Sequence, residues 1–455
     1  MARDRLVTRP IDRLVVAPFE HLAHDAKASS LLLLAAAVAA LVWANLPGGG
    51  GYDHVWEQAL TLQLGPWGIT LSVREWINDA LMALFFLVVG LEIERELFVG
   101  SLSSVRAALL PAFGAIGGML VPAAIYVGVT AGTRGVSGWG VPMATDIAFA
   151  LGLLGLLAPG APPALRAFLA ALAIVDDLGA ILVIALFYSE SVAPSALVVL
   201  GVVLAALVVA NRLGVRRPLT YLLLGIPLWA ALHAAHLHAS LAGVILAFAI
   251  PARTRLDDAR FIDAAQRALD RFRDSSSHDT DPYSNLSQQD ALDDMQVAYA
   301  EAQSPSVRVM RALHPWVALL ILPLFALANA GVTLGDAGVA MLGTPVALGT
   351  LAGLVLGKPL GIVAGAWLAL RLRLADLPSG VSSFSSLVAV AMLGGIGFTM
   401  AIFIATLAFS DAASLAAAKF AILVSSAMAA LLGAVLLRRA AATDPAAASA
   451  PPVPT

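Results

Sequence analysis

The stretch ALAIVDDLGAILVIALF, Ala171 to Phe187, decides the fold because it places two adjacent carboxylates in an otherwise apolar segment. The apolar pattern predicts a helix from about Leu165 to Tyr188. At ~1.5 Å per residue, Asp176 and Asp177 then lie ~16 Å along it, near the middle of a ~30 Å hydrocarbon core. A charge there costs about 2.5–3.5 kcal/mol even on lenient insertion scales. Two such residues therefore indicate a functional or structural role that offsets this cost.

The adjacency of the two acids indicates how they are used. Neighbouring helix residues point ~100° apart, so Asp176 and Asp177 do not share one narrow salt-bridging seam. They fit better along a hydrated cavity between helices, as an ion or proton site. The alternative is a purely structural role, with both acids held by hydrogen bonds to neighbouring helices.

Composition places the whole chain in a membrane. Of 455 residues, 60% are hydrophobic and only 13% are charged, a profile typical of a polytopic α-helical membrane protein. The net charge of −3 and the scattered basic residues argue against a nucleic-acid partner. The absence of cysteine excludes disulfides and thiol chemistry.

The apolar runs predict about twelve transmembrane spans. We expect a tail over 1–27, spans 1–8 over 28–250, a polar loop over 251–313, spans 9–12 over 314–437 and a tail over 438–455. The predicted spans are Ala28–Leu46, Trp76–Phe98, Val105–Thr130, Val141–Ala158, Leu165–Tyr188, Ser195–Asn211, Leu219–Ala234, Leu237–Ile250, Pro315–Val332, Thr344–Arg371, Ser386–Phe409 and Leu415–Leu437.

Basic residues set the expected orientation. If the N-terminus is cytoplasmic, the loops on the outer side of the membrane contain Arg74 and Arg134. The tails and loops on the cytoplasmic side then contain many more lysines and arginines. The positive-inside bias therefore predicts that both termini are cytoplasmic.

Three places depart from simple spans. QALTLQLGPWGITLS, about 58–72, alternates around a Gly-Pro-Trp-Gly turn and predicts an outer-face β-hairpin that can pair with another subunit. Spans seven and eight are short and nearly continuous, which favours a partial hairpin. In the polar loop, the helix-like DDARFIDAAQRALDRF precedes DSSSHDTDPYSNLSQQD, which we interpret as flexible linker.

Two spans carry breaks. Pro142, Thr145 and Asp146 interrupt the start of span four, VPMATDIAFALG. Gly394, Gly395 and Gly397 interrupt MLGGIGFTMAIFIA in span eleven in the same way. This pattern suggests crossed, broken helices whose ends meet at mid-membrane and need compensating charges. Asp146 suits the positive ends. Lys358, in GLVLGKPLGIVAG, can compensate the negative ends or pair with Asp176; a structural ion pair alone is the other interpretation.

These residues suit a small hard cation. Sodium and lithium favour oxygen ligands, which two carboxylates, a threonine hydroxyl and carbonyls of an unwound span provide. Protons compete for the same oxygens, so a site with alternating access exchanges one for the other. We expect no cofactor beyond the transported ions.

The motifs together resemble the NhaA-type sodium/proton antiporters of bacterial inner membranes, over about Ala28 to Leu437. The resemblance is carried by WINDALMALFFLVVGLEIEREL, ATDIAFALG, AIVDDLGAI, HASLAGVI, LHPWVALLILPLFALANAGV, GKPLGI and GIGFTMAIFIA. It implies an inverted-repeat fold with crossed spans four and eleven, sodium and lithium exchanged for protons, and a homodimer in the bilayer.

The resemblance also implies residue roles. The ion would be bound by Asp177 with Asp176 and with Thr145 nearby, and Asp146 and Lys358 would be the compensating charges. The pH-sensing residues implied are Glu92, Arg95, Glu96 and His238. Two positions depart from well-known relatives, which have a basic residue at Glu94 and an acidic one at Met310. The loop before Met310 is also several tens of residues longer than theirs.

Two other functions remain open at this point. A sodium-coupled symporter of an organic anion would share broken helices, but it needs anion-binding groups, and no spare arginine lies in the spans that would line the cavity. An intramembrane protease could use the Asp pair or His233, His236 and His238. However, adjacent aspartates on one helix are poorly placed to flank a peptide bond, and the histidines lack an HExxH glutamate. We therefore predict a transporter and not an enzyme.

Overall fold

The computed structural model describes residues 26–46, 50–65, 67–100, 102, 104–188, 193–275, 285–334, 338, 340–377 and 384–443. Most of the predicted terminal tails and parts of several loops lie outside these residues. Within the described chain, seven helices are long and apolar enough to cross a membrane alone, and two bent helix pairs raise the total to nine. The count of twelve spans is therefore not confirmed.

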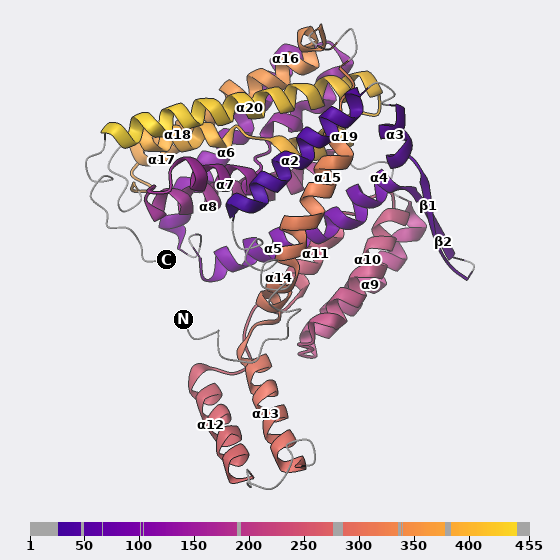
Figure 1. Cartoon of the computed structure of the whole chain (residues 1–455), viewed down its shortest axis with the longest axis vertical. Helices are drawn as coiled ribbons and strands as arrows, with labels where there is room; N and C mark the ends of the chain where they lie inside the picture. Colours follow the sequence, from indigo (N-terminus) through magenta and orange to yellow (C-terminus); the bar gives the residue numbers. More distant parts are fainter. Residues whose placement is uncertain are drawn as a thin grey trace.

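The long segments pack side by side (Figure 1), and three of them contain short π-helical stretches. Such stretches widen the helix locally and are frequent at functional sites. The segments are α2 (Ala26–Asn45), α4 (Val73–Glu75) with η2 (Trp76–Leu81) and α5 (Met82–Phe98), α6 (Val105–Thr130), α8 (Pro163–Phe187), α14 (Pro305–Trp316) with η4 (Val317–Ile321) and α15 (Leu322–Asn329), α16 (Pro345–Ala352) with η6 (Gly353–Gly357) and α17 (Lys358–Arg371), and α20 (Ala412–Thr443). Short pieces α3 (Gly50–Trp56) and η5 (Ala340–Gly343) connect them.

Both predicted breaks are present. The 3₁₀ segment η3 (Arg134–Met143) and α7 (Ile147–Leu157) meet at 46°, and α18 (Phe384–Gly394) and α19 (Phe398–Ala408) meet at 45°. The first break lies at residues 144–146, just after Pro142, where Asp146 adopts an extended conformation and caps α7. The second lies in the glycine run, so both breaks follow directly from residues that disfavour continuous helix.

The remaining predicted spans are shorter helices: α9 (Pro194–Arg212), α10 (Pro218–Ala234) and α11 (Leu241–Ala249). The last of these has only 9 residues, or about 14 Å at 1.5 Å per residue, which is too short to cross a bilayer. This agrees with the predicted partial hairpin, and the three shorter helices together account for the difference between nine and twelve spans.

The predicted β-hairpin is also present. Strand β1 (Ala59–Leu64) pairs antiparallel with β2 (Trp67–Ser72), and Leu64 lies opposite Trp67 across the turn. Gly65 in this turn has φ of +60°, a conformation that glycine adopts without strain.

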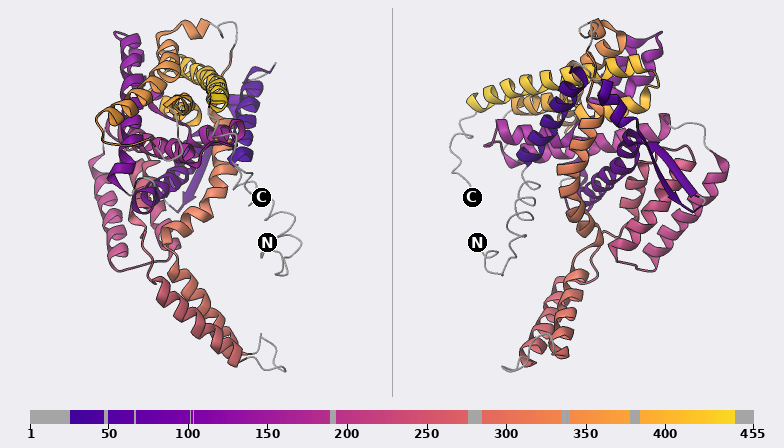
Figure 2. Two further views of the ribbon diagram at one scale, coloured as in Figure 1. Left: turned by 90° about the vertical axis from the view of Figure 1, so that its left-hand side faces the viewer. Right: turned by 45° about the vertical axis from the view of Figure 1, so that its right-hand side comes forward.

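The polar loop differs from our expectation. The helix-like part is α12 (Asp258–Asp274), but the supposed linker ends in a second helix, α13 (Leu286–Ala302), against which α12 packs. Residues 276–284 of that linker lie outside the described residues. The two helices form an antiparallel hairpin that projects from the rest of the molecule (Figures 1 and 2). We refer to it as the α12–α13 hairpin.

Small residues allow the membrane helices to approach closely. A Cβ atom on Gly117 of α6 would lie 2.1 Å from the carbonyl oxygen of Gly361 on α17, so these two backbones are in direct contact.

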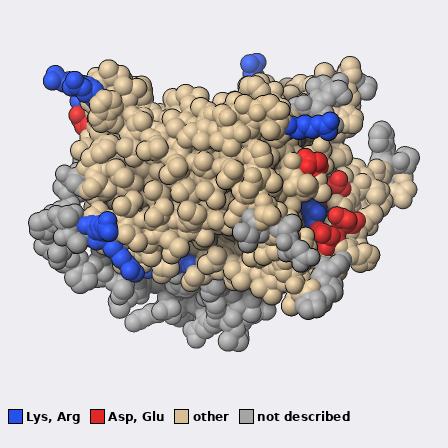
Figure 3. Space-filling model, turned by 90° about the horizontal axis from the view of Figure 1, so that it is seen from above, with Lys and Arg blue, Asp and Glu red and all other residues tan. Residues whose placement is uncertain are grey.

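Viewed from the α16 and α20 side, most of the surface carries no charge, and charged side chains gather at its edges (Figure 3). Such a surface fits contact with lipid.

Candidate functional site

The two broken helices contact one another through their breaks. The backbone N–H of Asp146 donates to the carbonyl of Ile396 at 2.8 Å, and the Thr145 hydroxyl donates to the carbonyl of Gly394 at 2.8 Å. Polar backbone groups freed by one break are thus satisfied by the other, as an apolar interior requires.

Asp146 lies between two helix N-termini. One of its carboxylate oxygens accepts from the N–H of Phe149 in α7 at 2.9 Å. The other accepts from the N–H of Thr399 at 3.1 Å and from its hydroxyl at 2.5 Å, at the start of α19. Because helix N-termini carry partial positive charge, one buried carboxylate compensates both ends. Thr399 was not among the residues predicted from sequence, although it lies within the quoted GFTM motif.

Lys358 occupies the complementary place. Its ammonium group is fully buried, forms an ion pair with Asp176 and donates to the carbonyl of Met143 at the C-terminal end of η3. From the sequence we considered two contacts for Lys358, one with a negative helix end and one with Asp176. The structure contains both. Met143 itself carried no sequence signal, because its contact is made by the backbone.

Asp176 and Asp177 retain unused acceptors. Both side chains are about 1% exposed, and Oδ1 of each has no hydrogen-bond partner among the described residues. Thr145 lies beside Asp176, so hydroxyl and carboxylate oxygens converge next to the crossing. Buried oxygens without partners are costly, and a small cation or a proton would satisfy them.

No ready-made cluster of three or more His, Cys, Asp or Glu side chains that could hold a metal occurs in the described part of the chain. Further ligands at the Asp pair would have to be hydroxyl, carbonyl or water oxygens, which suit sodium or lithium.

Sequence comparison provides the deciding observation. The family model described as Na+/H+ antiporter 1 matches residues 20–437, which include both breaks and the Asp pair. The chain belongs to this antiporter family.

Individual relatives agree with the family model over nearly their whole length. The chain is 47% identical to the Na(+)/H(+) antiporter NhaA of Oleidesulfovibrio alaskensis, over 94% of this chain and 95% of the relative. It is 45% identical to NhaA 2 of Myxococcus xanthus, over 94% and 90%. It is 45% identical to NhaA of Acidithiobacillus ferrooxidans, over 92% and 96%. These findings confirm the resemblance and give no support to a symporter.

Within this antiporter, the expected pH-sensing residues fall into two separate places. Glu92, Arg95 and Glu96 lie together at the C-terminal end of α5, where Arg95 pairs with Glu96 at 3.3 Å. Glu92 is half-buried. Glu94 is buried, and its Oε2 has no partner within the described residues.

His238 is not near this cluster. Its ring nitrogen Nε2 contacts the carbonyl of Tyr188 at 2.6 Å, in the connection between α10 and α11. Since Gly243 contacts Ala83 near the start of α5, His238 lies toward the opposite end of α5 from Glu92. The sequence could not reveal this separation because it depends on how α11 packs on α5.

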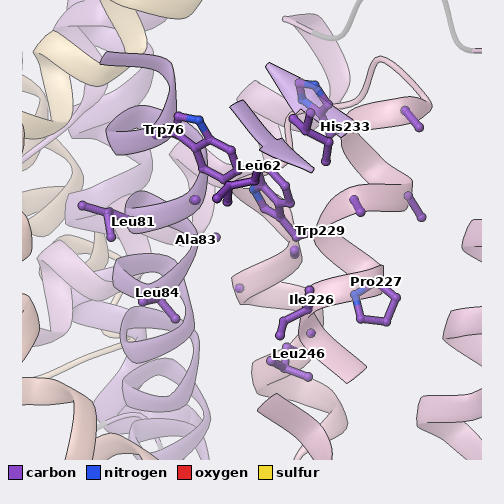
Figure 4. A pocket seen from close by; sticks show the side chains of 18 of the residues that line it. Leu62, Trp76, Leu81, Ala83, Leu84, Ile226, Pro227, Trp229, His233 and Leu246 are labelled. Carbon is purple, nitrogen blue, oxygen red and sulfur yellow. The ribbon is translucent and has the colours of Figure 1, made fainter. Parts of the chain in front are cut away.

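A cavity of about 1100 Å³ lies beside α5 but away from the Asp pair. It is bounded by the β-hairpin, α5, α10 and α11, and its walls are mainly apolar (Figure 4). Trp76 and Trp229 stack at 5.5 Å along it. Neither Asp176 nor Asp177 lines this space.

We predict that Lys358→Met destabilises the protein by about 3–5 kcal/mol, because it leaves Asp176 buried without its cation. Adding Asp176→Asn should recover most of this loss, since no charge then remains unpaired. Thermal unfolding in detergent measures both effects. The matched control is Arg106→Met, which removes an exposed pair with Asp376 (2.8 Å, side chains 73% and 75% exposed) and should cost at most about 1 kcal/mol. Equal losses in the single and double variants would contradict the assignment.

Proposed function

We propose that this protein exchanges sodium for protons across a membrane, using Asp177 and Asp176 as the shared site. The observation that supports this most directly is the pair of buried carboxylate oxygens without partners, next to two crossed helix breaks. The relatives are named Na(+)/H(+) antiporters, which supports sodium and protons as the exchanged ions.

In the proposed mechanism, cation and proton compete for the same atoms. Sodium binds between Asp177 and Asp176 with Thr145 as a further oxygen ligand, and its arrival displaces protons. On the other side, proton binding neutralises the carboxylates and releases sodium. Adjacent carboxylates titrate as a unit, so the displaced protons belong to the pair and not to one residue.

The paired charges have a different role. Asp146 and Lys358 neutralise the helix ends at the crossing, so the breaks can stay open without exposing uncompensated charge. We propose that this allows the site to alternate its access while the broken helices remain intact. Lys358 also shares Asp176 with the incoming cation, which limits how tightly that cation is held.

Several finer properties belong to the proposal. We propose that lithium is also carried, because it favours the same oxygens, and that pH controls activity through Glu92, Arg95 and Glu96. His238 lies too far from these residues to act with them, so it would be a separate pH-responsive site. We propose a bacterial inner-membrane location with both termini cytoplasmic, which agrees with the distribution of basic residues.

Asp177→Asn should reduce sodium- and lithium-driven proton movement to the level of empty liposomes, because the site loses both a ligand and a protonatable group. Asp176→Asn should be nearly as damaging. The assay uses proteoliposomes with an internal pH dye, and thermal unfolding shows that each variant is folded. Asp376→Asn, at an exposed position, is the control with parental activity. Normal exchange by folded Asp177→Asn protein would refute the proposed site.

For pH control, we predict that activity rises with pH and that Glu92→Gln and Glu96→Gln shift this profile even at saturating sodium. Neutralising part of the acidic cluster changes contacts at the end of α5 and hence access to the Asp pair. Competition at the Asp pair also gives a rising profile, but saturating sodium removes that contribution. Exposed Glu57→Gln is the control. Profiles identical to the parent would leave direct competition as the only source of pH dependence.

We further propose that the protein is a homodimer to which the β-hairpin contributes, because its two strands leave unpaired edges. Deleting residues 58–72 should shift detergent-solubilised protein toward monomer in light scattering, while each subunit still exchanges ions. An unchanged dimer fraction would count against the β-hairpin.

A further inference from the structure

The α12–α13 hairpin is held together by small side chains at heptad spacing. Ala268 on α12 and Ala291 and Ala298 on α13 are fully or almost fully buried. Ala268 lies seven residues after Phe261 and four before Phe272, and Ala291 lies three residues after Gln288 and seven before Ala298. These are spacings of the heptad repeat of a two-stranded coiled coil.

On each helix, the residues that directly follow the buried ones in sequence form a second, exposed row of large side chains. Along α12 it contains Ile262 and Leu269, and along α13 it contains Leu292 and Tyr299. These four large side chains are 48–57% exposed, although each helix already has a buried face. Each residue of the second row is rotated by about 100° from the buried residue before it. Because the two helices are antiparallel, this rotation brings both second rows to the same side of the hairpin, where they form one continuous face. We call it the apolar face.

The two sides of the hairpin differ in charge. Away from the apolar face, Arg271 pairs with Asp294 at 2.5 Å between the helices. Along the apolar face, the intervening positions are Gln266 and Gln296. The nearest charged side chains of the described helices by heptad position are Asp258 and Arg273, close to its two ends. An uncharged face with an ion-paired reverse side indicates contact with protein and not with water alone.

The register makes this face complementary to itself. Asn285 donates to the carbonyl of Ser275 at 2.7 Å, and Arg271 pairs with Asp294, which fixes how the helices align. Leu269 then lies level with Leu292, and Ile262 lies level with Tyr299. A two-fold axis along the hairpin sets α12 of one copy against α13 of the other, so that apolar residues meet apolar residues.

The same operation places Gln266 opposite Gln296 of the second copy, where two side-chain amides can exchange hydrogen bonds. No like charges oppose one another along the centre of the face. A two-fold contact must be self-complementary in this way, whereas a contact with an unrelated partner need not be.

We propose that the apolar face of the α12–α13 hairpin binds the same face of a second copy of this chain, forming a four-helix bundle outside the membrane. Each helix has 17 residues, so the contact is about 25 Å long and about 20 Å wide, on the order of 500 Å² per copy. This is small for a free dimer. It suffices between chains held in one bilayer, where the effective concentration is high and both hairpins project from the same side.

The chain contains no cysteine, so introduced cysteines report a single contact. Two differently tagged copies, Leu269→Cys and Leu292→Cys, are co-expressed and oxidised in permeabilised membranes. We expect a covalent heterodimer carrying both tags. The control pair, Arg267→Cys with Asp290→Cys, lies off the apolar face on the same helices and should give at least tenfold less. Exchange activity is not measured, so failure here is distinct from failure of the antiport proposal.

A second arm tests the centre of the bundle. Gln266→Lys in one copy and Gln296→Lys in the other place two like charges opposite each other at exposed positions, where they leave each hairpin folded. We expect the Leu269 and Leu292 cross-link to fall at least tenfold in this background. Gln266→Lys in one copy with Gln296→Glu in the other should restore the cross-link.

Three results would overturn the proposal. The first is full reactivity of both cysteines with a water-soluble maleimide and no heterodimer. The second is equal cross-linking by the control pair, which indicates random collision. The third is protection by another occupant, seen either as a cross-link to a different protein or as protection that is lost when residues 1–25 are deleted.

Discussion

The structure depends on how helix ends are neutralised in an apolar interior. Interrupting two helices inside a membrane frees backbone N–H and C=O groups, each of which costs several kcal/mol if left without a partner. Asp146 accepts from the N-termini of α7 and α19, and Lys358 donates to the carbonyl end of η3. Without these two buried charges, the helix ends at the crossing would keep uncompensated partial charges in an apolar interior.

The same arrangement separates structural charges from working ones. The oxygens of Asp146 are fully engaged, and Asp176 is shared with Lys358. Asp177 is equally buried but forms no ion pair in the described structure, which leaves it best placed to take up a cation or a proton. In the proposed mechanism, these carboxylate oxygens without protein partners are the atoms for which the cation and the proton compete.

The two helix breaks, the buried carboxylates and the β-hairpin could be predicted from sequence because their residues are energetically unfavourable in ordinary apolar helices. Carboxylates within an apolar run, proline and glycine within spans, and a Gly-Pro-Trp-Gly turn each violate a strong local rule. What could not be predicted depends on packing. Met143 acts through its backbone, and His238 is positioned by the packing of α11 on α5.

The polar loop shows a further limit. Residues Leu286–Ala302 have a composition typical of linkers, yet their alanines fit closely against α12, and only the partner helix makes that pattern meaningful. Local composition therefore fails to predict helices that are marginally stable alone and form only when they pack against each other.

The central claim is that sodium and protons occupy the same carboxylate oxygens, and proton release on sodium binding tests it most directly. Calorimetric titration of the purified protein with sodium, in buffers of different ionisation enthalpy, counts the protons released. If the two ions share these oxygens, sodium binding releases protons and sodium affinity weakens as pH falls. Sodium binding that releases no protons and has the same affinity at every pH would contradict it.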